Sequence, residues 1–233
     1  MEVNTSDFNN TVIILNAPPN AGKDTVADAL AEEIGVQHSR FKEHLYQVTA
    51  VLFNMDVATL RGLASDRDAK DVPHPSLVLE LSAFRKLRAV LKTSDFRPEP
   101  ICISPREALI FASEVVVKPT MGEDYFGNVF ASNINIETGT VASDGGFEDE
   151  IYPCIERVGR ENVFIVQFTR KGVNSFDGDS RDWVNIKGVP SLKTTNNATV
   201  ENIIGDIIEF ITLIKASRGP RSMKTNVEAK CQK

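Results

Sequence analysis

The chain has 233 residues, of which 42% are hydrophobic and 25% are charged, and this is the composition of an ordinary globular protein. The balance excludes a collagen-like or wholly disordered chain, and no apolar run approaches the roughly 18 residues that a membrane helix needs. The three cysteines, Cys102, Cys154 and Cys231, are odd in number and widely spaced. We therefore expect reduced thiols of a cytoplasmic protein, without a disulfide framework or a zinc site.

The charge is distributed unevenly along the chain. Residues 215–233 hold six Lys or Arg and one Glu, a net charge of +5, whereas the whole chain carries −6, so residues 1–214 carry −11. Such an acidic body argues against a general nucleic-acid binder. The basic segment has little apolar surface to bury, which favours a flexible tail over an arm that binds nucleic acid or a partner.

The first elements alternate between strand and helix. Residues 11–15 are a continuous apolar, β-branched run, which is typical of a strand buried on both faces. A turn rich in Pro, Asn and Gly follows, and apolar residues at helical spacing then lead to Gly35, which predicts a helix. Residues 36–41 predict a second strand and residues 45–52 a second helix.

The middle of the chain is predicted to be mostly helical. Residues 64–75 are charged and contain prolines, which predicts a loop, and residues 77–91 predict a helix. Ser104 begins a further helix, because Pro105 stands at the first helical position and Glu107 completes a capping box.

The last third returns to strands and helices. Residues 140–143 and 163–169 are apolar runs that predict two buried strands with a helix between them. The isoleucine-rich seam over residues 200–214 predicts a final helix. Alternating strands and helices favour an α/β fold with a mostly parallel sheet covered by helices on both faces.

The segment Ala17-Pro-Pro-Asn-Ala-Gly-Lys-Asp-Thr25 carries the most specific chemistry. A phosphate-binding loop needs a glycine-containing turn between strand and helix, a lysine for the β- and γ-phosphates, and a hydroxyl for Mg²⁺. Gly22 and Lys23 supply the first two features, so we predict a fold of the P-loop NTPase type. Asp24 stands before the delayed hydroxyl of Thr25. It either holds Mg²⁺ through water, orients a phosphoryl acceptor, or only complements the helix macrodipole.

This Gly-Lys-Asp-Thr loop resembles that of the bacteriophage deoxynucleoside monophosphate kinases, P-loop enzymes that pass the γ-phosphate of ATP to a dNMP. Further segments resemble that family, in the same order, over roughly residues 11–214. These segments are Arg40-Phe41-Lys42, Ser104-Pro105-Arg106-Glu107, Gly122 to Phe126, Ser143 to Phe147 with Glu150, Arg170 with Asp179-Ser180-Arg181, and Asn196 to Thr199. The chain departs from the family at Phe126, where tryptophan is usual, at Gly146, where an arginine often stands, and at Ile110, Ser113 and Glu114.

The resemblance implies a domain plan and a set of site residues. The kinase domain would span residues 1–214, with a core of about 11–35 and 140–214, a helical monophosphate-binding insertion of about 36–135, a lid, and a tail of 215–233. The catalytic residues would be Lys23, Asp24, Arg106, Arg170 and Arg181. ATP would be bound by Asn20, Ala21, Gly22, Lys23, Asp24, Thr25, Arg170 and Asn196. The dNMP would be bound by Arg40, Lys42, Arg106, Phe126, Asp144 and Glu150, and Mg²⁺ would lie at Asp24 and Thr25, directly or through water.

Some of these residues have a second interpretation. Asp144 follows an apolar strand, where open α/β sheets bind ligands, but it is also what an ordinary turn contains. Arg170 and Arg181 either belong to a mobile lid or lie on a solvated loop, and Asn196 is equally suited to cap a helix. The histidines show no metal-ligand spacing, and no Ser/His/Asp arrangement is discernible in the sequence.

The sequence thus favours a deoxynucleoside monophosphate kinase of DNA-precursor synthesis that uses ATP and Mg²⁺. Its partners would be small-molecule substrates, with no membrane, no direct nucleic acid and a possible homodimer, in the cytoplasm of a host cell if the chain is viral. Two alternatives stay open: a P-loop kinase for another small phosphate acceptor, and a nucleotide-binding regulatory module. A monophosphate acceptor needs a second anionic site, for which Lys42 and Arg106 are the candidates.

Overall fold

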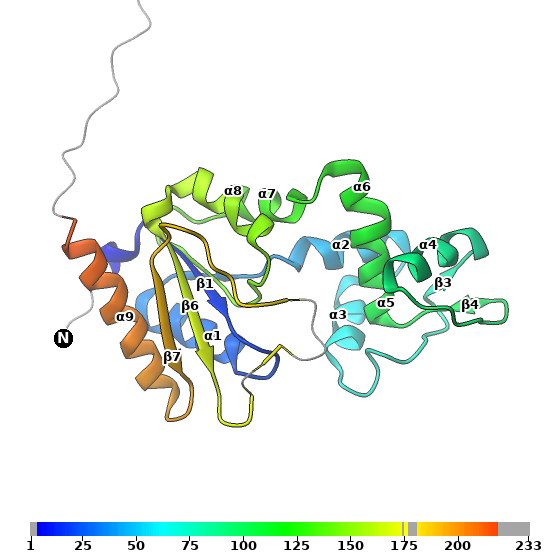
Figure 1. The fold of residues 1–233 in the computed structure, drawn as a ribbon, viewed down its shortest axis with the longest axis horizontal. Helices are drawn as coiled ribbons and strands as arrows, with labels where there is room; N and C mark the ends of the chain where they lie inside the picture. The colour runs from blue at the N-terminus through cyan, green and yellow to red at the C-terminus, as the bar shows by residue number, and fades with distance from the viewer. Residues whose placement is uncertain (1–3, 174, 177–180, 219–233) are drawn as a thin grey trace, which may run out of the picture.

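The computed structural model describes residues 4–173, 175–176 and 181–218, and its centre is a five-stranded sheet (Figure 1). The strand order is β2-β5-β1-β6-β7, and every neighbouring pair is parallel. The strands are β1 (Val12–Asn16), β2 (Gln37–Ser39), β5 (Thr140–Ala142), β6 (Val163–Thr169) and β7 (Ser191–Thr195). The predicted α/β class with a parallel sheet is therefore confirmed.

Helices cover both faces of this sheet, because β1 presents apolar side chains to each side. Ile13 and Leu15 belong to one core with α1 (Lys23–Ile34) and α9 (Val200–Ala216). Val12 and Ile14 belong to another core with α7 (Tyr125–Ser132) and α8 (Glu148–Val158). A short 3-10 helix, η1 (Thr5–Phe8), precedes β1, and another, η3 (Arg160–Asn162), precedes β6.

The remaining elements form a helical part beside the sheet, on the right in Figure 1. They are α2 (Glu43–Leu52), α3 (Val57–Ser65), β3 (Val78–Leu79), α4 (Leu81–Leu91), β4 (Ile101–Cys102), α5 (Pro105–Ile110), the π-helix η2 (Phe111–Val117) and α6 (Lys118–Met121). This part has its own hydrophobic core, in which Leu60, Leu77 and Phe84 are almost fully buried. Strand β2 belongs to the main sheet, and α7 packs on a face of that sheet. The helical part therefore includes fewer residues than the range 36–135.

The predicted strands and helices are present, but one of them begins at another residue and one strand of the sheet was not predicted. The helix predicted over residues 77–91 is wrong at its start, because residues 78–79 pair as β3 with β4, and α4 begins only at Leu81. The edge strand β7 has an alternating exposure pattern and was not predicted. At Ser104 the capping box is confirmed, since the Ser104 side chain accepts from the Glu107 N–H and the Glu107 carboxylate accepts from the Ser104 N–H.

The C-terminal helix extends into the segment that was assigned to the tail. Helix α9 ends at Ala216, and the Lys215 ammonium donates to the Asp7 carbonyl and to the Thr11 hydroxyl. The rest of the tail, residues 219–233, lies outside the described residues, as does Cys231, while Cys102 and Cys154 are free thiols. None of the helices in the described ranges has both the length and the hydropathy of a membrane span.

Candidate functional site

The loop between β1 and α1 folds around its own lysine. Gly22 adopts a left-handed conformation with φ of 94°, and Asn20 does so with φ of 66°. The Lys23 ammonium donates to the carbonyls of Ala17 (2.6 Å) and Pro18 (2.8 Å), and the side chain is buried. A buried ammonium thus lies beside the N-terminus of α1, where backbone N–H groups and the helix dipole favour anions.

Asn196, which lies far from this loop in the sequence, packs against it in the structure. Its side-chain amide donates to the Ala21 carbonyl at 2.9 Å, and its backbone N–H donates to the Thr169 carbonyl at 2.7 Å. A Cβ atom at Gly22 would lie 2.8 Å from the same amide nitrogen, so this position requires glycine both for its φ and for its space. Asn196 therefore lies with the predicted ATP-binding residues, and Arg170, which follows Thr169, is exposed at the same edge of the sheet.

Asp24 is held by side chains that directly follow two neighbouring strands, β2 and β5. Its Oδ1 atom accepts from the Arg40 guanidinium at 3.0 and 2.9 Å and from the Ser143 hydroxyl at 2.7 Å. Burial raises the pKa of Asp24, but the hydrogen bonds from Ser143 and Arg40 outweigh it, and the net effect is a lowered pKa. Arg40, which was assigned to the monophosphate, does not line the pocket described below; the structure places it against Asp24 instead.

The side chains at the start of α1 suit a magnesium ion. The Oδ2 atom of Asp24 accepts no hydrogen bond from the described residues, and the Thr25 side chain is exposed. These are oxygen donors, which Mg²⁺ prefers, and at nucleotide sites it takes its other ligands from phosphates and water. A group of three or more metal-binding side chains, which a site built only from protein would need, does not occur among the described residues.

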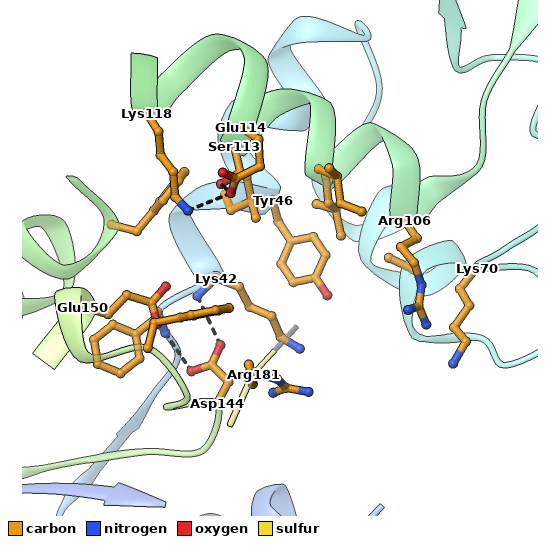
Figure 2. Close-up of a pocket in the computed structure, with 17 residues that line it drawn as sticks. Lys42, Tyr46, Lys70, Arg106, Ser113, Glu114, Lys118, Asp144, Glu150 and Arg181 are labelled. Carbon is orange, nitrogen blue, oxygen red and sulfur yellow. Dashed lines mark hydrogen bonds and ion pairs between the residues drawn. The ribbon is translucent and has the colours of Figure 1, made fainter. Parts of the chain in front are cut away.

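A pocket of about 350 Å³ lies beyond the ends of β2 and β5, between the sheet and the helical part (Figure 2). Phe41 and Lys42 reach it from the end of β2, and Asp144 from the end of β5. Its cationic lining residues are Lys42, Lys70, Arg106, Lys118 and Arg181. Figure 2 shows Lys42 and Arg181 converging near Asp144, while Arg106 and Lys70 lie together on another wall. The predicted residues Lys42, Arg106, Phe126, Asp144, Glu150 and Arg181 are all brought to this one pocket.

Asp144 joins the sheet to the helical part. Its Oδ1 atom accepts from the Phe41 N–H at 2.9 Å, and its Oδ2 atom accepts from the Lys42 N–H at 3.1 Å. Because both carboxylate oxygens bind backbone, Asp144 fixes the start of α2 and aims the Lys42 side chain. It therefore acts as a positioning residue in the pocket wall.

The end of the pocket that lies away from Arg106 and Lys70 combines aromatic rings with polar side chains. Phe126 on α7 is almost fully buried and Phe147 is partly exposed. On the π-helix, the Ser113 hydroxyl donates to Glu114 at 2.9 Å, and the Lys118 ammonium lies 2.7 Å from the same carboxylate. π-Helical turns recur at functional sites, and this one aims Ser113 and Glu114 into the pocket.

Glu150 also lines this end, and its ionisation is strongly perturbed. Burial, and after it the charge of Asp144, raises the pKa of Glu150 to about 8, although Lys118 and Arg181 oppose the shift. The carboxyl group is therefore mostly protonated at neutral pH. It then offers one O–H donor in addition to its acceptor oxygens.

Sequence reasoning missed a buried amide network at the end of the central strand. The Asn16 amide donates to the Asp182 carbonyl at 3.0 Å, and its oxygen accepts from the Val184 N–H at 3.0 Å and from the Gln167 amide at 3.1 Å. The signal was present, because Asn16 and Gln167 are polar residues inside otherwise apolar strands. Buried polar groups need such partners.

The structure brings a serine, a histidine and an aspartate together, which could not be discerned in the sequence. His38 Nε2 lies 2.9 Å from the Ser143 hydroxyl, and His38 Nδ1 lies 2.6 Å from the Asp28 carboxylate. Ser143 is only 2% exposed, and its hydroxyl donates to Asp24, so it cannot reach a substrate. The arrangement therefore supports Asp24 and does not supply a nucleophile.

Arg170 is not among the residues that line the pocket, and Asp179 and Ser180 lie outside the described residues. No protein-family model matches the chain, and no curated protein matches it either. What the molecule does must therefore be inferred from its loop and its pocket.

Proposed function

We propose that the protein is a deoxynucleoside monophosphate kinase of the P-loop type, which transfers the γ-phosphoryl group of ATP to the 5′-phosphate of a dNMP. The observation that carries the proposal is a pocket walled by Lys42, Lys70, Arg106 and Arg181 beside the loop that buries Lys23. Two pairs of residues that are neighbours in the sequence connect the loop to the pocket. Ser143 contacts Asp24, and the next residue, Asp144, lines the pocket. Arg40 also contacts Asp24, and the next residue, Phe41, lines the pocket.

The architecture supports the same proposal. A glycine-containing loop joins the central parallel strand β1 to α1, which is where a P-loop would lie. The helical part supplies Lys70 and Arg106 to the pocket, as a monophosphate-binding insertion would. A phosphate dianion in the pocket would meet these cations, and an arginine fork matches phosphate in a bidentate manner.

The reaction would ask little covalent chemistry of the protein. An oxygen of the acceptor phosphate forms a bond to the γ-phosphorus, the bond from this phosphorus to the β–γ bridging oxygen breaks, and ADP leaves with that electron pair. The attacking oxygen already carries negative charge at neutral pH, so no general base is required. Lys23 would hold the β- and γ-phosphates, and Arg106 and Lys42 would hold the acceptor phosphate in line.

The other groups would neutralise charge and bind the nucleoside. When bound at Asp24 and Thr25, Mg²⁺ supplies positive charge to the β- and γ-phosphates. Arg181 would stabilise charge on the transferred group, and Arg170 and Asn196 would lie on the ATP side. The aromatic end of the pocket, with Phe126, would receive the base, where Ser113, Glu114 and Glu150 offer hydrogen bonds.

A coupled assay for ADP release, with ATP, Mg²⁺ and each dNMP or NMP in turn, tests this proposal. We expect release that depends on the acceptor. Lys23→Ala should lower kcat by at least about 100-fold, because it removes charge from the transferring phosphates. Arg106→Ala should raise the KM for the acceptor by about tenfold or more and leave the KM for ATP nearly unchanged.

Lys86→Ala, an exposed cation on α4 that does not line the pocket, is the matched control and should behave as wild type. Silence with every monophosphate, while ATP still binds, would overturn the proposal and point to another acceptor. Activity that survives Lys23→Ala would contradict the assignment of the loop.

A further inference from the structure

The loop between α3 and β3 is held in one shape by its own hydrogen bonds. The Asp66 carboxylate accepts from the N–H groups of Asp68 (2.8 Å) and Ala69 (3.2 Å), which closes a turn around residue 67. The Lys70 carbonyl accepts from the Arg106 N–H at 3.0 Å, which ties the loop to the start of α5. This loop therefore presents its side chains from a fixed backbone.

Two cations of this loop point to different parts of the site. Lys70 lines the pocket, next to Arg106. Arg67 reaches the loop that precedes α1, and its guanidinium donates to the Asn20 side-chain oxygen at 2.9 Å. One short segment of the helical part thus touches both the acceptor pocket and the phosphate-binding side, three residues apart.

The partner of Arg67 distinguishes it from the other arginines nearby. Arg40, Arg61 and Arg106 each pair with a carboxylate. In the part of the chain that the structure describes, Arg67 forms no ion pair, and its hydrogen-bond acceptor is a neutral amide oxygen. A guanidinium bonds more strongly to an anionic oxygen than to a neutral one, so a phosphate placed at this loop would be the stronger partner.

We propose that Arg67 binds the γ-phosphoryl group of ATP from the acceptor side and stabilises the charge that develops on it during transfer. This inference rests on the proposed kinase function and deepens it, because it adds a catalytic residue that sequence reasoning did not assign. The γ-phosphate is the group in question because Arg67 comes from the segment that also lines the acceptor pocket. The phosphate that faces the acceptor is the terminal one.

Steady-state kinetics of Arg67→Ala and Arg67→Gln test the proposal. Each variant should lower kcat by on the order of 100-fold, since it removes one preorganised cation from the transition state. The KM for the acceptor should change by less than about threefold. Arg67→Gln retains an amide that can donate to Asn20, so it separates loss of the charge from loss of the loop contact. Free guanidinium should restore part of the Arg67→Ala activity, which a purely structural role would not allow.

Arg85→Ala, an exposed arginine on α4, is the matched control and should show neither effect. A kcat within about threefold of wild type for Arg67→Ala, or wild-type kcat in Arg67→Gln, would overturn the proposal. Both results would leave the kinase function itself intact.

A binding measurement keeps the inference testable even if no acceptor is phosphorylated. Titration with ADP and with a non-hydrolysable ATP analogue gives the preference of the protein for a γ-phosphate. Arg67→Ala should weaken binding of the analogue by about tenfold and leave ADP binding unchanged. Equal losses for both nucleotides, or no loss for either, would refute a contact to the γ-phosphate, whatever the acceptor assay shows.

Discussion

Glu150 couples the charge of the pocket to pH. Burial and the nearby Asp144 raise its pKa to about 8, from an ordinary value of 4.5 that applies to the unfolded chain. Because the pKa is higher in the folded state, the folded protein keeps the proton between these two values. The stability that the protonated carboxyl contributes is fully present below about pH 4.5 and is lost as the pH rises through 8.

Glu150→Gln should therefore remove a pH dependence of stability. The free energy of unfolding of wild type should fall relative to that of Glu150→Gln between pH 5 and pH 8, by on the order of 2–4 kcal/mol. Urea denaturation at several pH values measures this difference. Glu156→Gln, at an exposed position of the same helix, should track wild type. Parallel pH profiles for Glu150→Gln and wild type would contradict a raised pKa.

Residue types in a sequence indicate candidate chemistry, but they do not indicate partners. Lys23 could be named from the loop that contains it, and Lys42 and Arg106 from the resemblance of their segments to a family of phosphate-transferring enzymes. The pairing of Arg40 with Asp24 could not be named, since the two side chains lie 16 residues apart on different elements. A guanidinium fits a carboxylate as well as it fits a phosphate, and only the packed structure decides between them.

At the scale of elements, α7 and α8 approach so closely that one position accepts only glycine. A Cβ atom on Gly127 would lie 2.6 Å from the Glu150 carbonyl oxygen and 2.7 Å from its Cα. Backbone cannot move aside as a flexible side chain can. This contact also sets where Glu150 lies in the pocket wall.

Gly127→Ala should lower the free energy of unfolding by about 1–3 kcal/mol, because it forces the two helices apart. Gly62→Ala on α3 is the matched control, since nothing lies within 4 Å of its added Cβ. It should raise stability by about 0.5–1 kcal/mol through improved helix propensity. Thermal or urea unfolding of both variants measures this, and a neutral Gly127→Ala would show that the helices can separate without cost.

Elements with a strong local signal were predictable and weaker ones were not. Strands β1 and β6 are continuous apolar runs, and Ser104 carries a complete capping box. Strand β3 holds only two residues and exists through its pairing with β4, so a helical pattern over residues 77–91 concealed it. The π-helix is also set by packing, because nothing in Phe111–Val117 distinguishes it from an α-helix.

At the scale of the whole molecule, the pocket exists only where the sheet and the helical part meet. Lys42, Lys70, Arg106 and Arg181 come from four separated segments. No local pattern in a sequence encodes such a convergence, which explains why individual residues could be proposed but not their arrangement. Under the proposed function, the donor nucleotide and the dNMP both bind at this junction, and each should stabilise the folded protein.

Asp144→Ala should uncouple the two halves of the site. In wild type, ADP or a dNMP at about 100 times its dissociation constant should stabilise the fold by about 2.7 kcal/mol. In Asp144→Ala, the midpoint shift caused by the dNMP should shrink while the shift caused by ADP persists, because the Phe41 and Lys42 N–H groups lose their acceptor.

Differential scanning fluorimetry measures these shifts, each against the ligand-free midpoint of the same variant. Asp149→Ala, an exposed acid in the first turn of α8, serves as control. Equal loss of both shifts in Asp144→Ala would indicate a general disturbance of the sheet.

The Asn16 amide limits how far Arg181 can travel. Asn16 belongs to the middle strand, and its side chain holds the backbone at Asp182 and Val184, one and three residues after that arginine. The backbone is therefore fixed on the C-terminal side of Arg181, while the arginine side chain can still rotate. Less backbone entropy is then lost when this arginine meets an anion. An amide in the middle of the sheet would in this way favour the binding of an anion at Arg181.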